Sequence, residues 1–198
     1  MTTRPASSPA RPCSTALILV RHGRTALNAD GRLRGHLDPP LDEVGAADVR
    51  RLADAVAPLL SDGLPHRILA SPLQRTIRTA QAISDRTQLT VAPDDRLLDR
   101  DYGPWAGERL EDVVARWGSV DAAPGVEPLA SVTARVRSLL TEPIPDEPLV
   151  LVTHDAVLHV ILALLDPRLC TVALEPASWC LIGRQADQTL TVTSTNNQ

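Results

Sequence analysis

Three segments of the chain share one order of features: a short, mostly apolar run, a polar turn, and then a helical pattern. The apolar runs span residues 16–20, 67–70 and 149–152. Uninterrupted apolar runs of this length are typical of strands that are covered on both faces. The pattern therefore predicts buried parallel strands at the centre of the molecule.

Helical patterns fill the chain between these strands. Helical patterns are found in four segments: residues 42–60, 73–85, 131–140 and 156–165. Apolar side chains recur there at steps of three and four residues, except in residues 156–165, which are almost all apolar. Strands that alternate with helices predict a three-layer α/β/α sandwich with a mostly parallel central sheet. Residues 171–193 indicate two or three closing strands, with turns near Gly183 and Asp187.

The amino-terminal segment differs from the rest of the chain. Residues 1–15 are rich in Pro, Ser and Ala and contain no apolar segment of the kind found in secretory signals. We expect a flexible tail there and a single catalytic domain over residues 16–198. Residues 118–128 are rich in Gly, Ala and Pro, which predicts a loop that leaves this domain and returns to it. Because the apolar runs on both sides are needed to fill one sheet, we predict no second core.

The basic residues are all arginine: there are 20 of them, and lysine is absent. Schiff-base chemistry and the P-loop both need an ammonium group, so the composition excludes them. The net charge of −4 argues against general nucleic-acid binding. With three tryptophans, one tyrosine and no phenylalanine, the chain also offers little material for stacking bases.

The remaining composition bears on location and partners. No apolar run approaches the ~18 residues of a membrane-spanning helix, so we expect no membrane partner. The cysteines, Cys13, Cys170 and Cys180, are odd in number and lie at no metal-ligand spacing. They favour a reducing compartment, and we expect the protein in the cytoplasm. The sequence leaves the oligomeric state open, with a homodimer as one alternative.

Charged and polar side chains follow directly after the three predicted strands. Arg21 and His22 follow the first strand, Ser71 and Arg75 the second, and His154 the third. Ligands of open α/β sheets bind beyond the carboxyl ends of the strands. If the strands are neighbours, two imidazoles and two guanidiniums converge there, which predicts a pocket for a small anion.

The turn after the second strand strengthens this prediction. Ser71 and Pro72 are typical of a helix N-cap followed by proline at the first helical position. Arg75 then lies in the first turn, where free N–H groups and the helix dipole favour an anion. Guanidinium groups also match phosphate oxygens in a bidentate geometry.

Other interpretations of these residues are open at this point. A single histidine at a strand end is more often structural, and Arg75 with Arg78 could form a solvated helix face. A metal site is a further alternative, but His154 and His159 are not four residues apart and no H-E-x-x-H motif is present. Asp155 could ligate a metal, although the nearby arginines would repel it. The absence of G-x-S-x-G disfavours a serine hydrolase.

Five blocks of the sequence, in one order, resemble the histidine phosphatase superfamily, which is also called the phosphoglycerate mutase-like family. The first block contains R-H-G at residues 21–23, and the third contains S-P-L-x-R-T at residues 71–76. A lone R-H-G is a weak signal, whereas five ordered blocks are a specific one. The full set is residues 19–25 with Asn28, residues 35–41 with Gly45, residues 70–76 with Thr79 and Ala80, residues 97–107, and residues 152–154.

The resemblance implies a phosphoglycerate mutase-like fold and a role for each matching residue. His22 is then the nucleophile that forms a phosphohistidine. Arg21, Arg75 and His154 form the phosphate pocket and serve catalysis, with Asn28 as a further phosphate contact. Arg21 and Arg75 disfavour the imidazolium form of His22. No metal or other cofactor is implied, because the arginines supply the positive charge that Mg²⁺ supplies elsewhere.

The resemblance assigns the catalytic acid to Asp99, at a position where the family usually has glutamate. Asp99 would protonate the leaving oxygen and then activate water against the phosphohistidine. Its side chain is one methylene shorter than that of glutamate, so the acid or the leaving group must lie closer. Two alternatives are that Asp99 only pairs with Arg96 or Arg100, and that Asp101 is the acid.

Three further positions depart from the family pattern. Asp155 stands where glycine is frequent, Ala106 replaces a frequent glutamate, and His159 falls where arginine is common. The carboxylate of Asp155 could cap the following helix, repel an anion or contact a substrate hydroxyl. These departures do not affect the residues expected to bind the phosphate, but they leave the identity of the substrate undetermined.

Together these features predict a metal-independent phosphatase that hydrolyses a small organic phosphate monoester through a phosphohistidine. A phosphomutase is the nearest alternative, but family mutases tend to carry a longer insertion between the acid loop and the second histidine. The shorter segment here predicts a small lid around residues 103–128. The remaining alternatives are a phospho-ligand-binding protein with weakened catalysis and a repurposed biosynthetic enzyme.

Overall fold

The computed structural model describes residues 14–60, 66–141 and 149–198 of the chain. Most of the predicted tail, residues 1–13, lies outside them. Within the described ranges, six strands form one sheet in the order β3-β2-β4-β1-β5-β6. Their bounds are β1 Ser14–Arg21, β2 Arg67–Ala70, β3 Val91–Pro93, β4 Leu149–Thr153, β5 Trp179–Arg184 and β6 Leu190–Asn197.

The strand directions confirm a mostly parallel sheet. Strand β4 lies between β1 and β2 and is parallel to both, and β3 is parallel to β2. Strands β5 and β6 close the other edge in antiparallel pairs. The registers place Val20 opposite Val152 and Ala70 opposite Val152. The carboxyl ends of β1, β2 and β4 therefore lie side by side.

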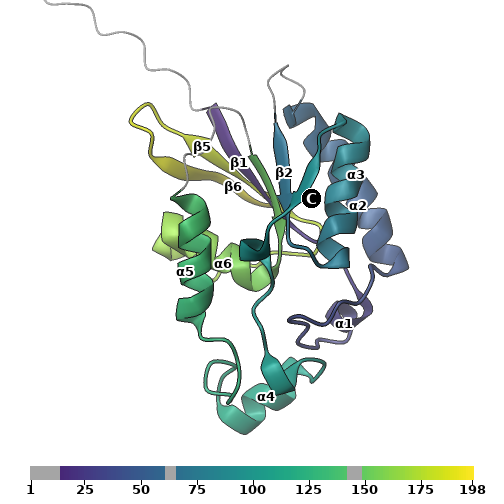
Figure 1. Ribbon diagram of the computed structural model, residues 1–198, viewed down its shortest axis with the longest axis vertical. Helices are drawn as coiled ribbons and strands as arrows, with labels where there is room; N and C mark the ends of the chain where they lie inside the picture. The colour runs from purple at the N-terminus through teal and green to yellow at the C-terminus, as the bar shows by residue number, and fades with distance from the viewer. Residues whose placement is uncertain (1–13, 61–65, 142–148) are drawn as a thin grey trace, which may run out of the picture.

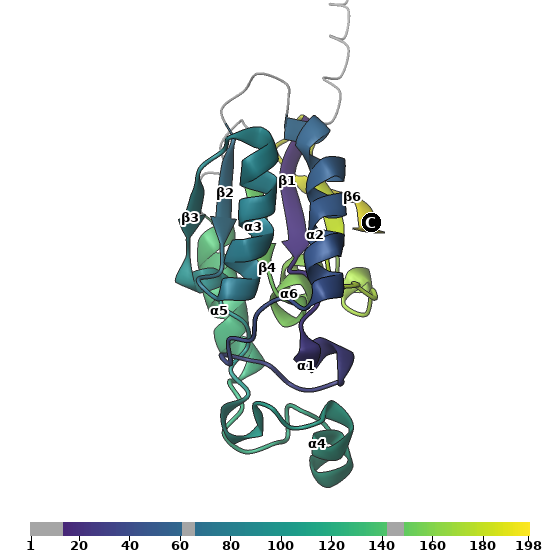
Figure 2. The same ribbon diagram turned by 90° about the vertical axis from the view of Figure 1, so that its right-hand side faces the viewer.

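Helices cover both faces of the sheet, as a three-layer sandwich requires (Figures 1 and 2). The α-helices are α1 Ala26–Ala29, α2 Glu43–Val56, α3 Gln74–Thr87, α4 Leu110–Trp117, α5 Leu129–Leu140 and α6 Asp155–Leu165. Short 3-10 turns are η1 Ala57–Leu60, η2 Asp95–Leu97, η3 Gly103–Trp105 and η4 Pro167–Leu169. Figure 2 shows α2 and α3 in front of the sheet and α5 and α6 behind it.

The apolar run of β1 explains why both faces are covered. Leu17 and Leu19 belong to the core cluster that includes α5 and α6 residues, whereas Ile18 and Val20 belong to the cluster with α2 and α3. Successive side chains of a strand point to opposite faces, so a continuous apolar run needs a helix layer on each side. The predicted fold class is confirmed.

Several predicted element boundaries are wrong in detail. The helix predicted over residues 42–60 ends as an α-helix at Val56 and continues as η1, because Pro58 has no N–H to donate to the preceding turn. Helix α3 begins at Gln74 with Leu73 as N-cap, so Ser71 is not the cap. The Ser71 backbone N–H instead donates to the Val152 carbonyl at 3.0 Å and extends the pairing between β2 and β4.

The carboxyl-terminal strands also differ from the prediction. Gly183 lies inside β5, paired with Thr15 and Thr191, rather than near a turn. The turn lies between β5 and β6, where the Gln185 N–H donates to the Thr189 carbonyl, and it contains Asp187 as expected.

The segment after the acid loop packs a small core of its own. Val113 and Ala123 of this segment pack with Tyr102 of the acid loop and Leu33 of the loop after β1, and Trp105 and Trp117 pack against these four residues. The apolar runs of the sequence predict no second core, but the two tryptophans supply enough apolar area to build one outside the sandwich. Figure 1 shows α4 beyond the carboxyl ends of the strands. Whether this segment acts as a lid stays a prediction.

Gly45 brings α2 close to the loop that follows β1. A Cβ at this position would lie 2.6 Å from the backbone nitrogen and 2.8 Å from the carbonyl carbon of Arg24. Glycine is therefore required for the close approach between the helix and the segment next to His22.

We expect Gly45→Ala to lower the free energy of unfolding by about 1–3 kcal/mol, because the new methyl group meets backbone atoms that cannot move aside. The sign of this change in the free energy of unfolding is informative, because a glycine-to-alanine change in an uncrowded helix raises the stability of a protein by up to about 1 kcal/mol. Urea unfolding followed by circular dichroism measures it. An unchanged or higher midpoint would contradict the close approach.

Candidate active site

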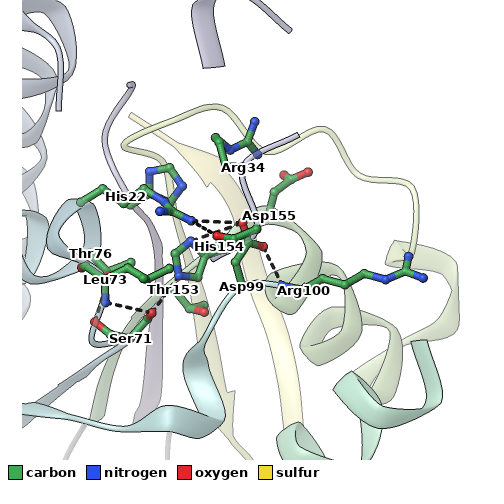
Figure 3. Close-up of polar contacts among 12 residues, drawn as sticks. His22, Arg34, Ser71, Leu73, Thr76, Asp99, Arg100, Thr153, His154 and Asp155 are labelled. Atoms are coloured by element: carbon green, nitrogen blue, oxygen red, sulfur yellow. Dashed lines mark hydrogen bonds and ion pairs between the residues drawn. The ribbon is translucent and has the colours of Figure 1, made fainter. Parts of the chain in front are cut away.

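The residues that follow β1, β2 and β4 converge at one edge of the sheet. His22 follows β1, Ser71 follows β2 and His154 follows β4, and all three are buried. The imidazole centroids of His22 and His154 are 5.1 Å apart with the rings tilted by 61°. Figure 3 shows the His154 ring between Ser71 and Asp99, with the His22 ring next to it. The structure thus brings together side chains that are far apart in the sequence.

The backbone fixes the tautomer of His22. Its Nδ1 lies 2.7 Å from the carbonyl oxygen of the next residue, Gly23. A carbonyl oxygen only accepts hydrogen bonds, so Nδ1 carries the proton and Nε2 keeps its lone pair. Nε2 is buried and has no hydrogen-bond partner among the described residues. A free nitrogen lone pair inside a buried site is what a nucleophile needs.

The second histidine is held at the start of α6. His154 is the N-cap residue of this helix, and its Nε2 lies 2.9 Å from the hydroxyl oxygen of Ser71. Its Nδ1 is buried, has no hydrogen-bond partner among the described residues, and lies 3.8 Å from the Asp99 carboxylate. Ser71, which does not cap α3, therefore orients His154 instead.

Both imidazoles are neutral near physiological pH. Burial, and then the positive charge of Arg75, hold the pKa of His22 well below its ordinary value of 6.5. Burial, and then His22 and Arg75, lower the pKa of His154 in the same direction. A neutral His22 presents its lone pair without first losing a proton.

Arg75 is fully buried and tied to the loop that lines the site. One terminal nitrogen donates to the Leu37 carbonyl at 2.7 Å, and the other donates to the Gly35 carbonyl at 2.9 Å. The second nitrogen also lies 3.2 Å from the Asp99 carboxylate. Arg75 sits in the first turn of α3, as predicted, because the helix begins at Gln74.

Asp99 lies inside the site with a carboxylate that is 1% exposed. It accepts a hydrogen bond from the backbone N–H of Arg100 at 2.9 Å. Burial raises its pKa, and the charge of Arg75 only partly opposes that rise. The guanidinium of Arg96 binds Asp94, and that of Arg100 binds Asp121, so neither alternative pairing with the Asp99 carboxylate is found among the described residues.

Asp101, the alternative acid, is used in local structure. Its carboxylate accepts from the backbone N–H of Gly103 at 2.8 Å. Asn28 also has a structural partner, because its amide oxygen accepts from the Thr25 N–H and hydroxyl in the capping box of α1. A phosphate contact by Asn28 stays a prediction.

Arg21 is positioned by Asp155, which stands where the family often has glycine. A terminal nitrogen of Arg21 lies 3.2 Å from the Asp155 carboxylate and also contacts the Leu174 carbonyl. The other oxygen of Asp155 lies 3.7 Å from Nδ1 of His159. Among the described residues, the Asp155 carboxylate pairs with Arg21 and His159 and accepts no hydrogen bond from a backbone N–H of α6, so the capping interpretation is wrong.

Arg34 also belongs to the site, and sequence reasoning missed it. Figure 3 shows its guanidinium over the site, near His22 and Asp155. Its positive charge lowers the pKa of His22, His154 and Asp99 alike. The sequence feature that could have indicated Arg34 is its position in residues 31–35, a segment with glycine at both ends. That position by itself predicts only that the segment forms a wall of the pocket.

Comparisons with known proteins agree with this geometry. The sequence profile of the histidine phosphatase superfamily (branch 1) matches residues 17–198. The chain is 32% identical over 187 residues to a glucosyl-3-phosphoglycerate phosphatase of Mycobacterium tuberculosis, covering 84% of this chain and 79% of that one. It is 31% identical over 166 residues to a Bacillus subtilis protein named uncharacterized phosphatase PhoE, covering 81% and 83%.

A solved structure shares the fold as well. The mycobacterial glucosyl-3-phosphoglycerate phosphatase in complex with VO3 superposes with a TM-score of 0.79 at 26% identity, covering 92% of this chain and 99% of that one. The family expected from five sequence blocks is confirmed, as is the class of enzyme. The chain belongs to the histidine phosphatase superfamily, branch 1, and is similar to members of it that are named phosphatases.

Proposed function

We propose that this protein hydrolyses small organic phosphate monoesters through a phosphohistidine on Nε2 of His22. The observation that carries the proposal is this nitrogen itself: it is buried and unprotonated, and Arg75 and His154 lie beside it. The guanidiniums of Arg21 and Arg75 bind the equatorial oxygens of the phosphoryl group, over which the negative charge of the transition state is spread.

In the first step, Nε2 of His22 bonds to phosphorus while the bond from phosphorus to the ester oxygen breaks. Asp99 gives its proton to the leaving oxygen, so an alcohol departs rather than an alkoxide. The raised pKa of Asp99 supports this role, because a protonated carboxyl group is needed at the start. Its 3.8 Å separation from Nδ1 of His154 places it on the other side of the second ring from Ser71.

In the second step, water attacks phosphorus and the bond between phosphorus and Nε2 breaks. The Asp99 carboxylate takes the proton from this water, which restores the acid for the next turnover. His154 holds a phosphoryl oxygen, and Ser71 keeps its ring in place. Phosphate then leaves between Arg21 and Arg75.

The substrate class is proposed as small phosphorylated metabolites. The relative from Mycobacterium tuberculosis is named for glucosyl-3-phosphoglycerate, and phosphate esters of hydroxy acids are therefore reasonable first candidates. In the part of the chain that the structure describes, no helix has the length and apolar character to cross a bilayer. We propose a cytoplasmic location, on the grounds that Cys170 and Cys180 are unpaired thiols.

We expect the purified protein to release inorganic phosphate from a panel of esters, including p-nitrophenyl phosphate, glycerol 3-phosphate and 3-phosphoglycerate, with excess EDTA present. Among the described residues, no group of three His, Cys, Asp or Glu side chains is arranged to hold a metal ion. Malachite-green detection of phosphate, with product analysis for phosphoglycerate isomers, measures the outcome. Activity that EDTA removes would contradict the metal-free mechanism, and isomerisation without phosphate release would establish a mutase.

A further inference from the structure

Arg34 differs from the other two guanidiniums of the site in its partners. Arg21 lies 3.2 Å from Asp155, and Arg75 lies 3.2 Å from Asp99. No carboxylate among the described residues lies within ion-pair distance of Arg34. One of its terminal nitrogens donates to the backbone carbonyl of Arg32 at 3.0 Å. Its Nε is buried without a hydrogen-bond partner among the described residues, as are those of Arg21 and Arg75, so the absence of a carboxylate is what distinguishes Arg34. A buried donor without an acceptor is unfavourable, so the arrangement favours a ligand that supplies one.

The guanidinium of Arg34 is held on a fixed stretch of backbone. The carbonyl of the next residue, Gly35, accepts from Arg75 at 2.9 Å, and the Leu37 carbonyl accepts from the same side chain at 2.7 Å. Gly35 has a φ of +52°, and a Cβ there would lie 3.1 Å from the Tyr102 nitrogen. The loop that presents Arg34 is therefore tied to the residue that we propose as a phosphate ligand. A charged side chain on such a support loses little freedom when it binds.

The position of Arg34 suits the part of a substrate beyond the phosphoryl group. Arg75 is fully buried, whereas Arg34 is partly exposed. Figure 3 shows the Arg34 side chain on the side of the site where His22 and Asp155 lie, away from Ser71. In-line attack by Nε2 of His22 directs the leaving oxygen away from His22, toward Asp99. To bring a carboxylate to Arg34, the carbon skeleton on that oxygen must turn toward the loop that carries this arginine, whose charge also acts on Asp99.

Two other arginines of this region already have partners. Arg109 lies 2.9 Å from the carboxylate of Glu111, and the guanidinium of Arg116 stacks over Trp105 and Trp117 at 5.3 and 5.2 Å from the ring centroids. They are thus poorer candidates than Arg34 for binding a substrate anion.

We propose that Arg34 binds a carboxylate of the substrate, so that the enzyme prefers phosphate monoesters of hydroxy acids over the corresponding alcohol phosphates. This inference rests on the proposed phosphatase function and names the substrate class of the same site. The planar fork of a guanidinium matches the two oxygens of a carboxylate. Arg34 is in this sense a specificity residue.

The test compares two esters that differ in one group. 3-Phosphoglycerate carries a carboxylate where glycerol 3-phosphate carries a hydroxymethyl group. We expect the wild-type protein to have the higher kcat/KM for 3-phosphoglycerate. In Arg34→Gln we expect the ratio of kcat/KM for 3-phosphoglycerate to kcat/KM for glycerol 3-phosphate to fall on the order of tenfold to a hundredfold. This is the effect expected from the loss of one charge-assisted hydrogen bond. Arg34→Lys, which keeps the charge but not the fork, retains part of the ratio.

The matched control is Arg109→Gln, an arginine at the same rim that is not part of the proposed site; its ratio should equal that of the wild type. A fall of both kcat/KM values by the same factor in Arg34→Gln would overturn the inference, because Arg34 would then bind the phosphoryl group common to both esters. An unchanged ratio in Arg34→Gln, or a ratio lost in Arg109→Gln instead, would overturn it too.

A binding experiment separates this inference from the proposed function. Calorimetry gives the Kd of 3-phosphoglycerate and of glycerol 3-phosphate for His22→Ala and for His22→Ala/Arg34→Gln, neither of which needs turnover. We expect the preference for 3-phosphoglycerate to be present in the first and lost in the second. If the wild type hydrolyses no ester at all, the proposed function fails, and the ratio of Kd values still decides the role of Arg34: equal ratios in the two proteins would refute it.

Discussion

Replacing His22 with alanine is expected to lower kcat/KM for every phosphate monoester by roughly 10⁴-fold or more, the scale seen when a covalent nucleophile is removed. The reason is specific to one atom: Nδ1 is bound to the Gly23 carbonyl, so only Nε2 can attack phosphorus. A water molecule in the space left by the ring cannot replace it, because water is a much weaker nucleophile and Asp99 is engaged with the leaving oxygen rather than with that water.

The covalent intermediate gives this prediction a second readout. Quenching the wild-type protein during turnover of a ³²P-labelled ester should trap phosphate that is labile to acid and stable to alkali, as expected for a phosphoramidate. His22→Ala should trap none. His66→Gln is the matched control, since His66 precedes β2 at the opposite end of the sheet from the site. Turnover retained by His22→Ala, or labelling that survives in it, would show that phosphoryl transfer does not pass through this ring.

The pattern of the sequence is sufficient to predict the strands that carry the site. The runs at residues 16–20 and 149–152 are apolar at every position, and only a strand between two helix layers buries all of them. The side on which the ligand binds then follows from the polar residues at the strand ends. For this reason the sequence alone predicts that His22 and His154 converge.

Contacts between loops cannot be predicted in the same way. The sequence places Asp155 at the start of its own helix, where it could act as a cap, but the guanidinium of Arg21 across the strand ends holds its carboxylate instead. Ser71 has the pattern of a helix cap, but it supports His154. In both cases the side chain contacts a residue far away in the sequence instead of its own helix. No periodic pattern in the sequence indicates which distant residue that is. Arg34 escapes prediction for the same reason.

Asp99→Asn is expected to lower kcat for alkyl phosphates such as glycerol 3-phosphate by about 10²- to 10⁴-fold, the contribution of a positioned general acid. An alkoxide is a poor leaving group without a proton, and an amide cannot supply one. p-Nitrophenolate leaves readily without protonation, so the first step with p-nitrophenyl phosphate should slow far less. The second step still lacks its base, and a burst of p-nitrophenol followed by slow turnover should appear in stopped-flow absorbance.

The pH dependence tests the same residue through its protonation state. Hydrolysis of alkyl phosphates needs Asp99 protonated, and burial raises its pKa above the ordinary value of 3.8. The rate should therefore fall as pH rises through that raised pKa. Because the pKa of His22 lies well below 6.5, loss of the nucleophile by protonation sets in only at lower pH. In Asp99→Asn we expect the fall in rate at high pH to disappear and the rest of the pH–rate profile to keep its shape.

These readouts distinguish a catalytic Asp99 from one that only holds Arg75. The two side chains lie 3.2 Å apart, so removing the charge of Asp99 also disturbs a phosphate ligand. A purely positioning role predicts equal losses for p-nitrophenyl phosphate and glycerol 3-phosphate, no burst, and an alkaline limb that persists in the variant. Asp99→Glu adds the methylene that the family usually has and keeps the acid, so it should retain most of the activity toward glycerol 3-phosphate that Asp99→Asn loses. A substrate-independent loss in both variants would leave Asp99 with a structural role and return the assignment of the acid to Asp101.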